Sequence, residues 1–158
     1  MNLKYLPAIE QDRAFFIHVH HTAYRDTIEE MFGWDEERQD ELANLPFDEG
    51  GINIVWNRDN RIGVVGWEER EDHLWLKELF LLPEYQGQGI GSQIVKDTIT
   101  KSRSLAKDVR LRTLKANTRA KELYERHGFV VTEASDIHWN ESRWASNYQC
   151  SVFRSLQK

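Results

Sequence analysis

The chain has 158 residues, which suits a single domain over residues 1–158 that buries one hydrophobic core. Its net charge is −5 at pH 7 and its lysines and arginines are scattered, which disfavours nucleic acid as a main partner. No apolar run reaches the roughly 18 residues of a membrane span, no secretory signal is visible at the N-terminus, and Cys150 is the one cysteine, so we expect a cytoplasmic protein without an internal disulfide.

Hydrophobic periodicity and turn residues predict ten elements along the chain. They are a strand over 3–9, helices over 11–32 and 34–45, strands over 51–57, 62–69 and 73–82, a helix over 90–105, a strand over 108–114, a helix over 118–128 and a strand from 129. The order β-α-α-β-β-β-α-β-α-β indicates a mixed sheet with helices on its faces.

Three local features refine this pattern. Asp35 is expected to cap the helix over 34–45, with Pro46 just past its end, and RDNR (58–61) predicts a hairpin. One more strand is expected near the C-terminus. The weakly alternating segment 148–153 is a candidate for it.

Three glycines follow an apolar strand in the stretch LFLLPEYQGQGIGSQIV (79–95). Glycine allows unusual backbone conformations and lets a ligand approach the main chain. Gly87, Gly89 and Gly91 stand where a strand passes into a helix, whose first N–H groups and dipole attract phosphate oxygens. The spacing is neither a P-loop nor G-x-G-x-x-G. On the glycines alone, a tight turn without a ligand is an equally good interpretation.

The spacing does match Q/R-x-x-G-x-G/A, as Gln86-Gly87-Gln88-Gly89-Ile90-Gly91, and a second motif, NTRAKELYERHGF, occupies residues 117–129. With the order of elements, these motifs resemble the GNAT superfamily of N-acetyltransferases over residues 3–138. The resemblance implies an α/β fold of the GNAT type, with a mixed, predominantly antiparallel sheet and helices on both faces. It also implies acetyl-coenzyme A as co-substrate.

The resemblance assigns residues to acetyl-coenzyme A. The glycine loop would hold the pyrophosphate, residues 79–81 would pair with the pantetheine arm, and a backbone N–H near Leu81 would stabilise the oxyanion. Tyr124 would hydrogen-bond or protonate the leaving thiolate, the alternative being a core aromatic residue. The predicted coenzyme-binding residues are Leu79, Phe80, Leu81, Gln86, Gly87, Gln88, Gly89, Ile90, Gly91, Ser92, Asn117, Ala120 and Tyr124.

Glu78 is the candidate base. It lies in LWLKELFLL, a strand that otherwise reads as buried, on the face that alternation gives to Leu76 and Phe80. A carboxyl group in such surroundings is expected to have a raised pKa, which suits a residue that accepts or relays a proton. A solvated position beside Lys77 is an equally good interpretation.

The acceptor amine should bind near the first helices, where the stretch 18–39 is rich in histidine, aromatic and acidic residues. Core packing explains most of these, and Tyr24, Arg25 and Trp34 are the best candidates for an acceptor pocket, with His138 near the end of the family pattern. His18 and His21 have a spacing that metal ligands use, but no third ligand is evident, so no metal site is predicted.

We therefore expect an N-acetyltransferase that moves the acetyl group of acetyl-coenzyme A to a primary amine of a small molecule or peptide by direct attack, with Tyr124 assisting the thiolate. The expected oligomeric state is a monomer or a homodimer. One alternative is a non-catalytic acyl-coenzyme A sensor on the same fold. Another is an unrelated α/β protein whose glycine loop is only a turn.

Overall fold

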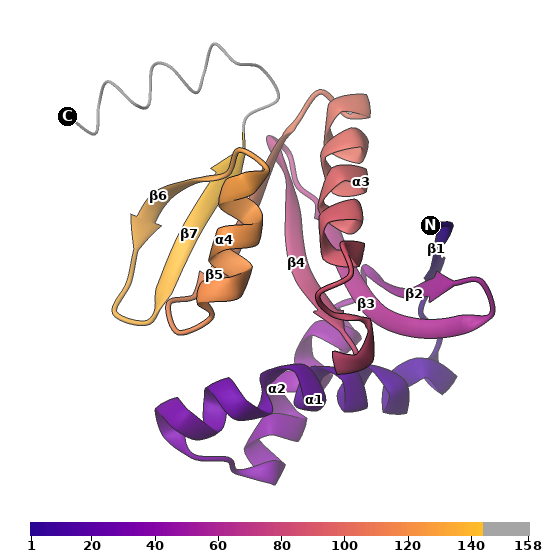
Figure 1. The fold of residues 1–158 in the computed structure, drawn as a ribbon, viewed down its shortest axis with the longest axis vertical. Coiled ribbons are helices and arrows are strands. Elements are labelled where there is room, and N and C mark those ends of the chain that lie inside the picture. The colour runs from indigo at the N-terminus through magenta and orange to yellow at the C-terminus, as the bar shows by residue number, and fades with distance from the viewer. Residues whose placement is uncertain (144–158) are drawn as a thin grey trace. The chain divides into compact units, whose positions relative to one another are not determined.

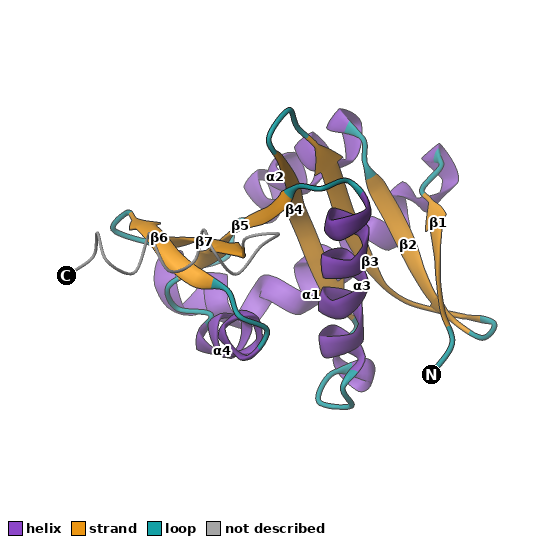
Figure 2. Cartoon of the chain, turned by 90° about the horizontal axis from the view of Figure 1, so that it is seen from above, coloured by secondary structure: helices purple, strands orange, loops and turns teal. Residues whose placement is uncertain are grey.

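The structure is a computed structural model that describes residues 1–143. Within these residues, seven strands belong to one mostly antiparallel sheet and four α-helices accompany them (Figures 1 and 2). The predicted α/β class with a mixed sheet is therefore confirmed. No helix in the described part of the chain is long and apolar enough to cross a membrane.

The elements follow one another with short connections. They are β1 Leu3–Pro7, α1 Arg13–Phe32, α2 Glu36–Glu49, β2 Ile52–Asn57, β3 Asn60–Glu69, β4 His73–Leu81, α3 Ile90–Ser104, β5 Asp108–Leu114, α4 Thr118–Arg126, β6 Val130–Ala134 and β7 His138–Arg143. The chain forms two compact units: Met1–Glu68 with Lys77–Gly91, and Glu69–Leu76 with the chain from Ser92 onward. Strand β4 contributes residues to both.

In the first unit, β1, β2 and β3 are successive antiparallel neighbours. Asn57 pairs with Asn60, so Arg58 and Asp59 form the predicted hairpin turn, with Arg58 at φ 55°. The core of this unit joins α1 and α2 to β2, β3 and β4. Its buried members are Phe16, Val19, Ala43, Ile52, Ile54, Val64 and Phe80. Apolar side chains at helical spacing on α1 and at alternate positions on β2 supply this core.

Helix α2 begins as predicted and ends later than predicted. The side chain of Asp35 accepts a hydrogen bond of 3.0 Å from the backbone N–H of Arg38, which confirms the cap. The prediction that Pro46 lies past the helix is wrong, because the helix continues to Glu49. The buried Lys77 donates to the carbonyl oxygens of Pro46 and Gly50, at 3.2 and 2.9 Å, and these bonds satisfy acceptors at the helix end.

In the second unit, β4 and β5 are parallel, and β7 lies antiparallel between β5 and β6. One more strand was expected near the C-terminus, but its position at β7 was not predicted, because HWNESR shows no apolar alternation. Six successive pairs with β5, from Val109↔Arg143 to Leu114↔His138, define it. The candidate strand at 148–153, like Cys150, lies outside the described residues.

Candidate functional site

The glycine loop links the end of β4 to the start of α3 within the first unit. A short 3₁₀ turn at Pro83–Tyr85 precedes it, and Gly87 and Gly89 both adopt left-handed backbone conformations, at φ 71° and 81°. A Cβ added at Gly89 would meet no heavy atom of the described residues within 4 Å. The loop backbone at Gly89 is therefore open to a ligand.

Two glutamine side chains fix the shape of this loop. The side-chain amide of Gln86 donates to the carbonyl oxygen of Leu81 at 2.9 Å, and that of Gln88 donates to the carbonyl oxygen of Glu84 at 2.6 Å. Ile90, which begins α3, is buried and anchors the other end. The first turn of α3 contains no acidic residue, so its unpaired N–H groups present positive charge that suits an anion.

Ser92, in the second unit, has a basic neighbourhood. Its hydroxyl oxygen lies 3.0 Å from Nε2 of His127. Burial, followed by the charges of Lys96, Arg126 and Arg143, lowers the pKa of His127. Lys96, Arg126 and Arg143 were not among the predicted site residues, although Arg126 stands inside the second motif. A phosphate group near Ser92 would be favoured by them.

The second motif forms α4 and the turn after it. Asn117 is the N-cap of this helix, and its side-chain oxygen accepts from the backbone N–H of Ala120 at 3.1 Å. Tyr124 is 7% exposed and its ring packs against Phe129, with 5.5 Å between ring centroids. Gly128 has φ 86° and follows the end of the helix, as predicted. Asn117 and Tyr124 thus have structural roles at α4, and their contacts with a ligand stay predictions.

Glu78 is partly buried on β4, beside Lys77 of the same strand. Burial raises the pKa of Glu78 to about 8, the nearby Lys77 opposes this rise and Glu49 adds to it. A carboxyl group with this pKa exchanges its proton close to neutral pH. The raised pKa agrees with the expectation for a carboxyl group in these surroundings, and the role of Glu78 in proton transfer stays a prediction.

A second carboxyl group, that of Glu141 on β7, is fully buried and was not predicted. Thr113 donates a hydrogen bond of 3.0 Å to one carboxyl oxygen, and the other oxygen has no partner within residues 1–143. Burial raises the pKa of Glu141 to about 7. The group is therefore partly protonated at neutral pH.

Glu141→Gln should change the pH dependence of stability. Because the folded state raises the pKa from its ordinary 4.5 to about 7, the wild type should lose stability as pH rises from about 4.5 to about 7. The uncharged glutamine removes this loss, so the variant should have a melting temperature several degrees above that of the wild type at pH 8 and close to it at pH 4.5. Thermal melts at both pH values test this. An equal difference at the two pH values would contradict it.

Aromatic side chains gather around His20, a buried residue of α1. The ring centroid of His20 lies 5.4 Å from those of Tyr24 and Phe80, and the rings of Tyr24 and Phe80 are 4.8 Å apart. Burial and the neighbouring His21 lower the pKa of His20 to about 4, so its ring is uncharged at neutral pH. The predicted acceptor residue Tyr24 thus lies next to Phe80, one of the predicted coenzyme-binding residues.

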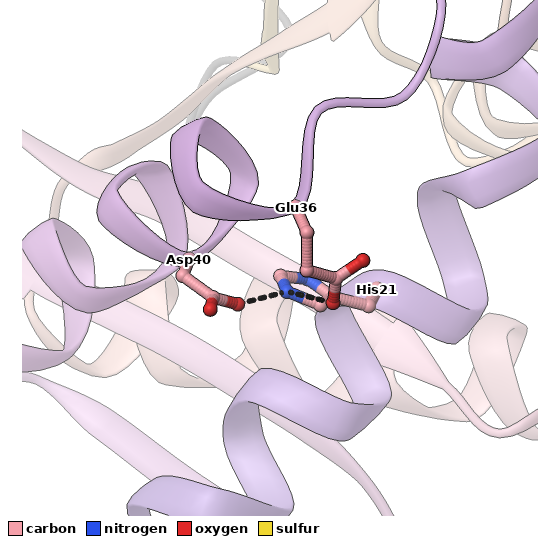
Figure 3. Close-up of side chains that lie close together, drawn as sticks. All are labelled: His21, Glu36 and Asp40. Atoms are coloured by element: carbon pink, nitrogen blue, oxygen red, sulfur yellow. Dashed lines mark hydrogen bonds and ion pairs between the residues drawn. The ribbon is translucent and has the colours of Figure 1, made fainter.

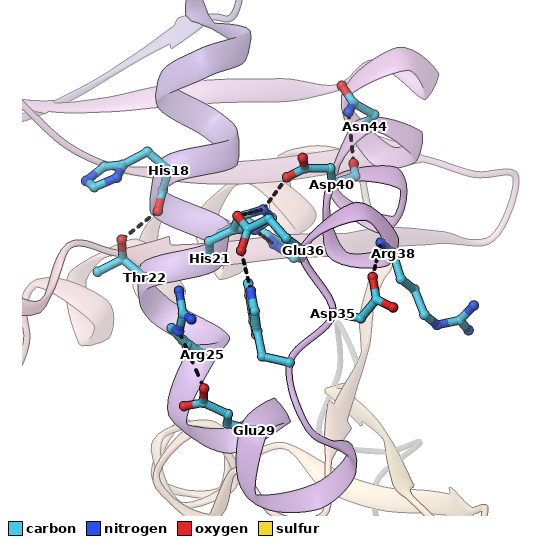
Figure 4. Close-up of polar contacts among 12 residues, drawn as sticks. His18, His21, Thr22, Arg25, Glu29, Asp35, Glu36, Arg38, Asp40 and Asn44 are labelled. Carbon is cyan, nitrogen blue, oxygen red and sulfur yellow. Dashed lines mark hydrogen bonds and ion pairs between the residues drawn. The ribbon is translucent and has the colours of Figure 1, made fainter.

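The other two predicted acceptor residues of this unit, Arg25 and Trp34, contact each other. The guanidinium carbon of Arg25 lies 5.0 Å from the ring centroid of Trp34, and Arg25 also approaches Glu29 at 3.8 Å (Figure 4). The indole N–H of Trp34 donates to Glu36 at 2.6 Å. His138, the fourth candidate, begins β7 in the second unit, where burial and Arg112 lower its pKa.

The structure also brings together three side chains that the sequence did not connect. His21 of α1 lies beside Glu36 and Asp40, which are four residues apart on α2 (Figure 3). Nε2 of His21 is 2.6 Å from a carboxyl oxygen of Asp40 and 3.8 Å from one of Glu36. His18, the residue first paired with His21 by its spacing, is not part of this group.

Comparisons with known proteins agree on one family. The family model described as Acetyltransferase (GNAT) family matches residues 16–129. The thialysine N-epsilon-acetyltransferase of Bos taurus is 38% identical over 104 residues, which cover 62% of this chain and 58% of that protein.

Solved structures resemble the fold over nearly the whole chain. The PaiA N-acetyltransferase of Thermoplasma acidophilum, solved in complex with coenzyme A, has a TM-score of 0.75 at 16% identity and covers 91% of this chain and 99% of its own. The putative acetyltransferase YncA of Salmonella typhimurium, solved with acetyl-CoA, has a TM-score of 0.62 at 14% identity. The match covers 93% of this chain and 96% of the YncA chain.

Proposed function

Because the chain belongs to the Acetyltransferase (GNAT) family, we propose that it transfers the acetyl group of acetyl-coenzyme A to a primary amine of a small molecule or peptide. One observation carries the proposal: the loop of Gln86–Gly91, with two left-handed glycines and an open approach at Gly89, leads into a helix N-terminus. Such a loop offers backbone N–H groups to a pyrophosphate.

The residues present fit acetyl-coenzyme A. Gln86–Gly91 would hold the pyrophosphate, and the basic neighbourhood of Ser92 would favour a further phosphate. Residues 79–81 would pair with the pantetheine arm, and Asn117, Ala120 and Tyr124 complete the proposed contacts. When bound, the coenzyme supplies an acetyl thioester whose sulfur departs as a thiolate.

The chain must then move two protons. The attacking amine loses one, and Glu78, with its pKa of about 8, is proposed to accept it directly or through water. The departing sulfur gains a hydrogen bond or a proton, for which the hydroxyl of Tyr124 is proposed. A backbone N–H near Leu81 would stabilise the negative charge that develops on the carbonyl oxygen.

The acceptor is proposed to be the side-chain amine of an amino acid or a related small molecule. The bovine relative carries the name of an enzyme acting on thialysine at its ε nitrogen, an amine of this class. Tyr24, Arg25, Trp34 and His138 are the proposed acceptor residues. Arg25 suits the carboxylate of an amino acid better than its amine, because a guanidinium pairs with carboxylates and repels cations.

Glu78→Gln should remove one ionisation from the pH–rate profile. In the wild type, kcat/KM should rise as pH increases through about 8, because the carboxyl group must lose its proton before it can accept one. The variant should lack this rise, so its deficit relative to the wild type should grow as pH increases through about 8. At higher pH, where more of the amine is deprotonated, the difference should narrow.

Profiles of both proteins from pH 6 to 10 with one acceptor measure this effect. Parallel profiles would remove Glu78 from the proton path. A change confined to the KM of the acceptor would instead make Glu78 a group that attracts a cationic substrate.

A panel of acceptor amines tests the proposed function itself. Purified protein is mixed with acetyl-coenzyme A and, in turn, lysine, thialysine, a polyamine and a peptide with a free N-terminus, while released thiol is measured. Turnover with at least one amine is the expected result. Tight binding of acetyl-coenzyme A without turnover on any amine would favour the non-catalytic sensor, and failure to bind would overturn the proposal.

A further inference from the structure

His21, Glu36 and Asp40 converge from two helices of the first unit, and we propose that they bind a divalent transition-metal ion, with Zn²⁺ as the best fit. His21 projects from α1, and Glu36 and Asp40 project from the first turns of α2 toward it (Figure 3). One imidazole nitrogen and two carboxylates are a donor set that Zn²⁺ accepts in proteins. This proposal is independent of the acetyltransferase function.

The distances between the three donors are close to those around one ion. Nε2 of His21 and one oxygen of each carboxylate all lie within 4.8 Å of one another. Donors at about 2.0–2.2 Å from a common Zn²⁺ would lie roughly 3–3.5 Å apart. The 2.6 Å distance between Nε2 of His21 and the carboxyl oxygen of Asp40 must therefore lengthen slightly. The 3.8 Å distance between Nε2 of His21 and the carboxyl oxygen of Glu36 must shorten. Side-chain rotations alone can supply shifts of this size.

Partners outside the group orient two of the three donors. Nδ1 of His21 lies 3.0 Å from Nδ1 of the buried His20, so one ring donates to the other. When His21 is the donor, its Nε2 carries the lone pair that faces Asp40. On the other side, the indole N–H of Trp34 holds one oxygen of Glu36 and leaves the second oxygen nearest His21. Metal-ligating histidines and carboxylates have supporting hydrogen bonds of this kind.

The charge of the group favours a cation. At 2.6 Å, either a proton or a metal ion must lie between Nε2 of His21 and the carboxylate of Asp40. A proton there cannot offset the charge of both carboxylates. A divalent ion in that position balances the charge of both carboxylates.

Solvent reaches the group because the side chains of Glu36 and Asp40 are about half-exposed. A shallow depression there is lined by Glu36, Glu37, Asp40, Glu41, Asn44, Leu45 and Asp48. Its acidic lining would raise the local concentration of cations, and three protein donors leave a fourth position on Zn²⁺ for water. The site is thus an open one on the protein surface.

Calorimetry with ZnCl₂ on the full-length protein, freed of any affinity tag and of chelators, tests the proposal. The expected result is binding of one Zn²⁺ per chain, far tighter than that of Mg²⁺, which has little preference for imidazole. A melting temperature that rises with added ZnCl₂ gives a second readout.

Four variants locate the ion. His21→Asn and Asp40→Asn each remove a ligand and should weaken Zn²⁺ binding by more than roughly 100-fold. Trp34→Phe removes only the hydrogen bond to Glu36 and should weaken it by roughly 10- to 100-fold. His18→Asn, on the same helix but outside the group, should bind like the wild type. Since Asp40 is half-exposed, its variant should fold even if that of His21 does not.

Two results would overturn the proposal. One is the absence of Zn²⁺ binding by the folded wild type at micromolar to millimolar concentrations, which would leave only an ion pair between His21 and Asp40. The other is an unchanged affinity in folded Asp40→Asn and His21→Asn, which would place the bound ion elsewhere on the chain. Neither result bears on turnover with acetyl-coenzyme A, which is measured separately.

Discussion

Replacing Gly89 with valine is expected to abolish binding of acetyl-coenzyme A while the protein remains folded. The residue has φ 81°, where a branched side chain is unfavourable by roughly 1–2 kcal/mol, and its Cβ would enter the open space proposed for the pyrophosphate. Loss of two hydrogen bonds to a charged phosphate, at about 1.5–3 kcal/mol each, corresponds to at least about 100-fold weaker binding. Calorimetry with acetyl-coenzyme A measures this.

Gly50→Val is the matched control for this substitution. Gly50 also has a left-handed backbone, at φ 88°, and an added Cβ there would likewise meet no described heavy atom within 4 Å. It lies at the end of α2, outside the glycine loop. The two variants should therefore lose similar stability, but only Gly89→Val should lose affinity. Equal affinity in both would show that the loop does not hold the pyrophosphate.

The central strands and helices could be predicted because their sequences carry strong local signals. The alternation of DVRLRTL gave β5 with its observed bounds, and the glycines placed the start of α3 at Ile90. The strand β7 carries no such signal. Its polar sequence is extended because β5 and β6 supply hydrogen-bonding partners on both sides, and these contacts are distant in sequence. Pro46 was misjudged for a related reason, since Lys77 supports the helix end from a distant strand.

The candidate site likewise contains some residues that could be proposed from the sequence and others that could not. The glycine loop and Tyr124 could be proposed from the sequence because their glycines and motif spacing lie in contiguous residues, and their contacts with a ligand stay predictions. The group of His21, Glu36 and Asp40 could not be found from spacing, because its geometry depends on how α1 meets α2. Glu141 was missed because nothing in the polar segment HWNESR shows that its one carboxyl group will be fully buried.

Tyr124→Phe should lower kcat by about ten- to a thousandfold. This range overlaps the usual loss of rate when a general acid is removed and extends somewhat below it. The substitution removes one hydroxyl and keeps the ring that packs 5.5 Å from Phe129, so the hydrophobic contact survives. The KM for acetyl-coenzyme A should change little, because the proposed hydrogen bond to sulfur strengthens only as negative charge develops there. Steady-state kinetics with a fixed acceptor measures both constants.

Tyr5→Phe serves as the control, because Tyr5 also packs edge-on against an aromatic ring, that of Trp67, and has no proposed catalytic role. Both variants should melt close to the wild type, and only Tyr124→Phe should turn over slowly. If kcat of Tyr124→Phe stays within about twofold of the wild type, the buried position of Tyr124 is explained by packing alone. If kcat and the melting temperature fall together, the hydroxyl supports the fold. A loss of kcat at unchanged stability therefore distinguishes a proton donor from a core residue.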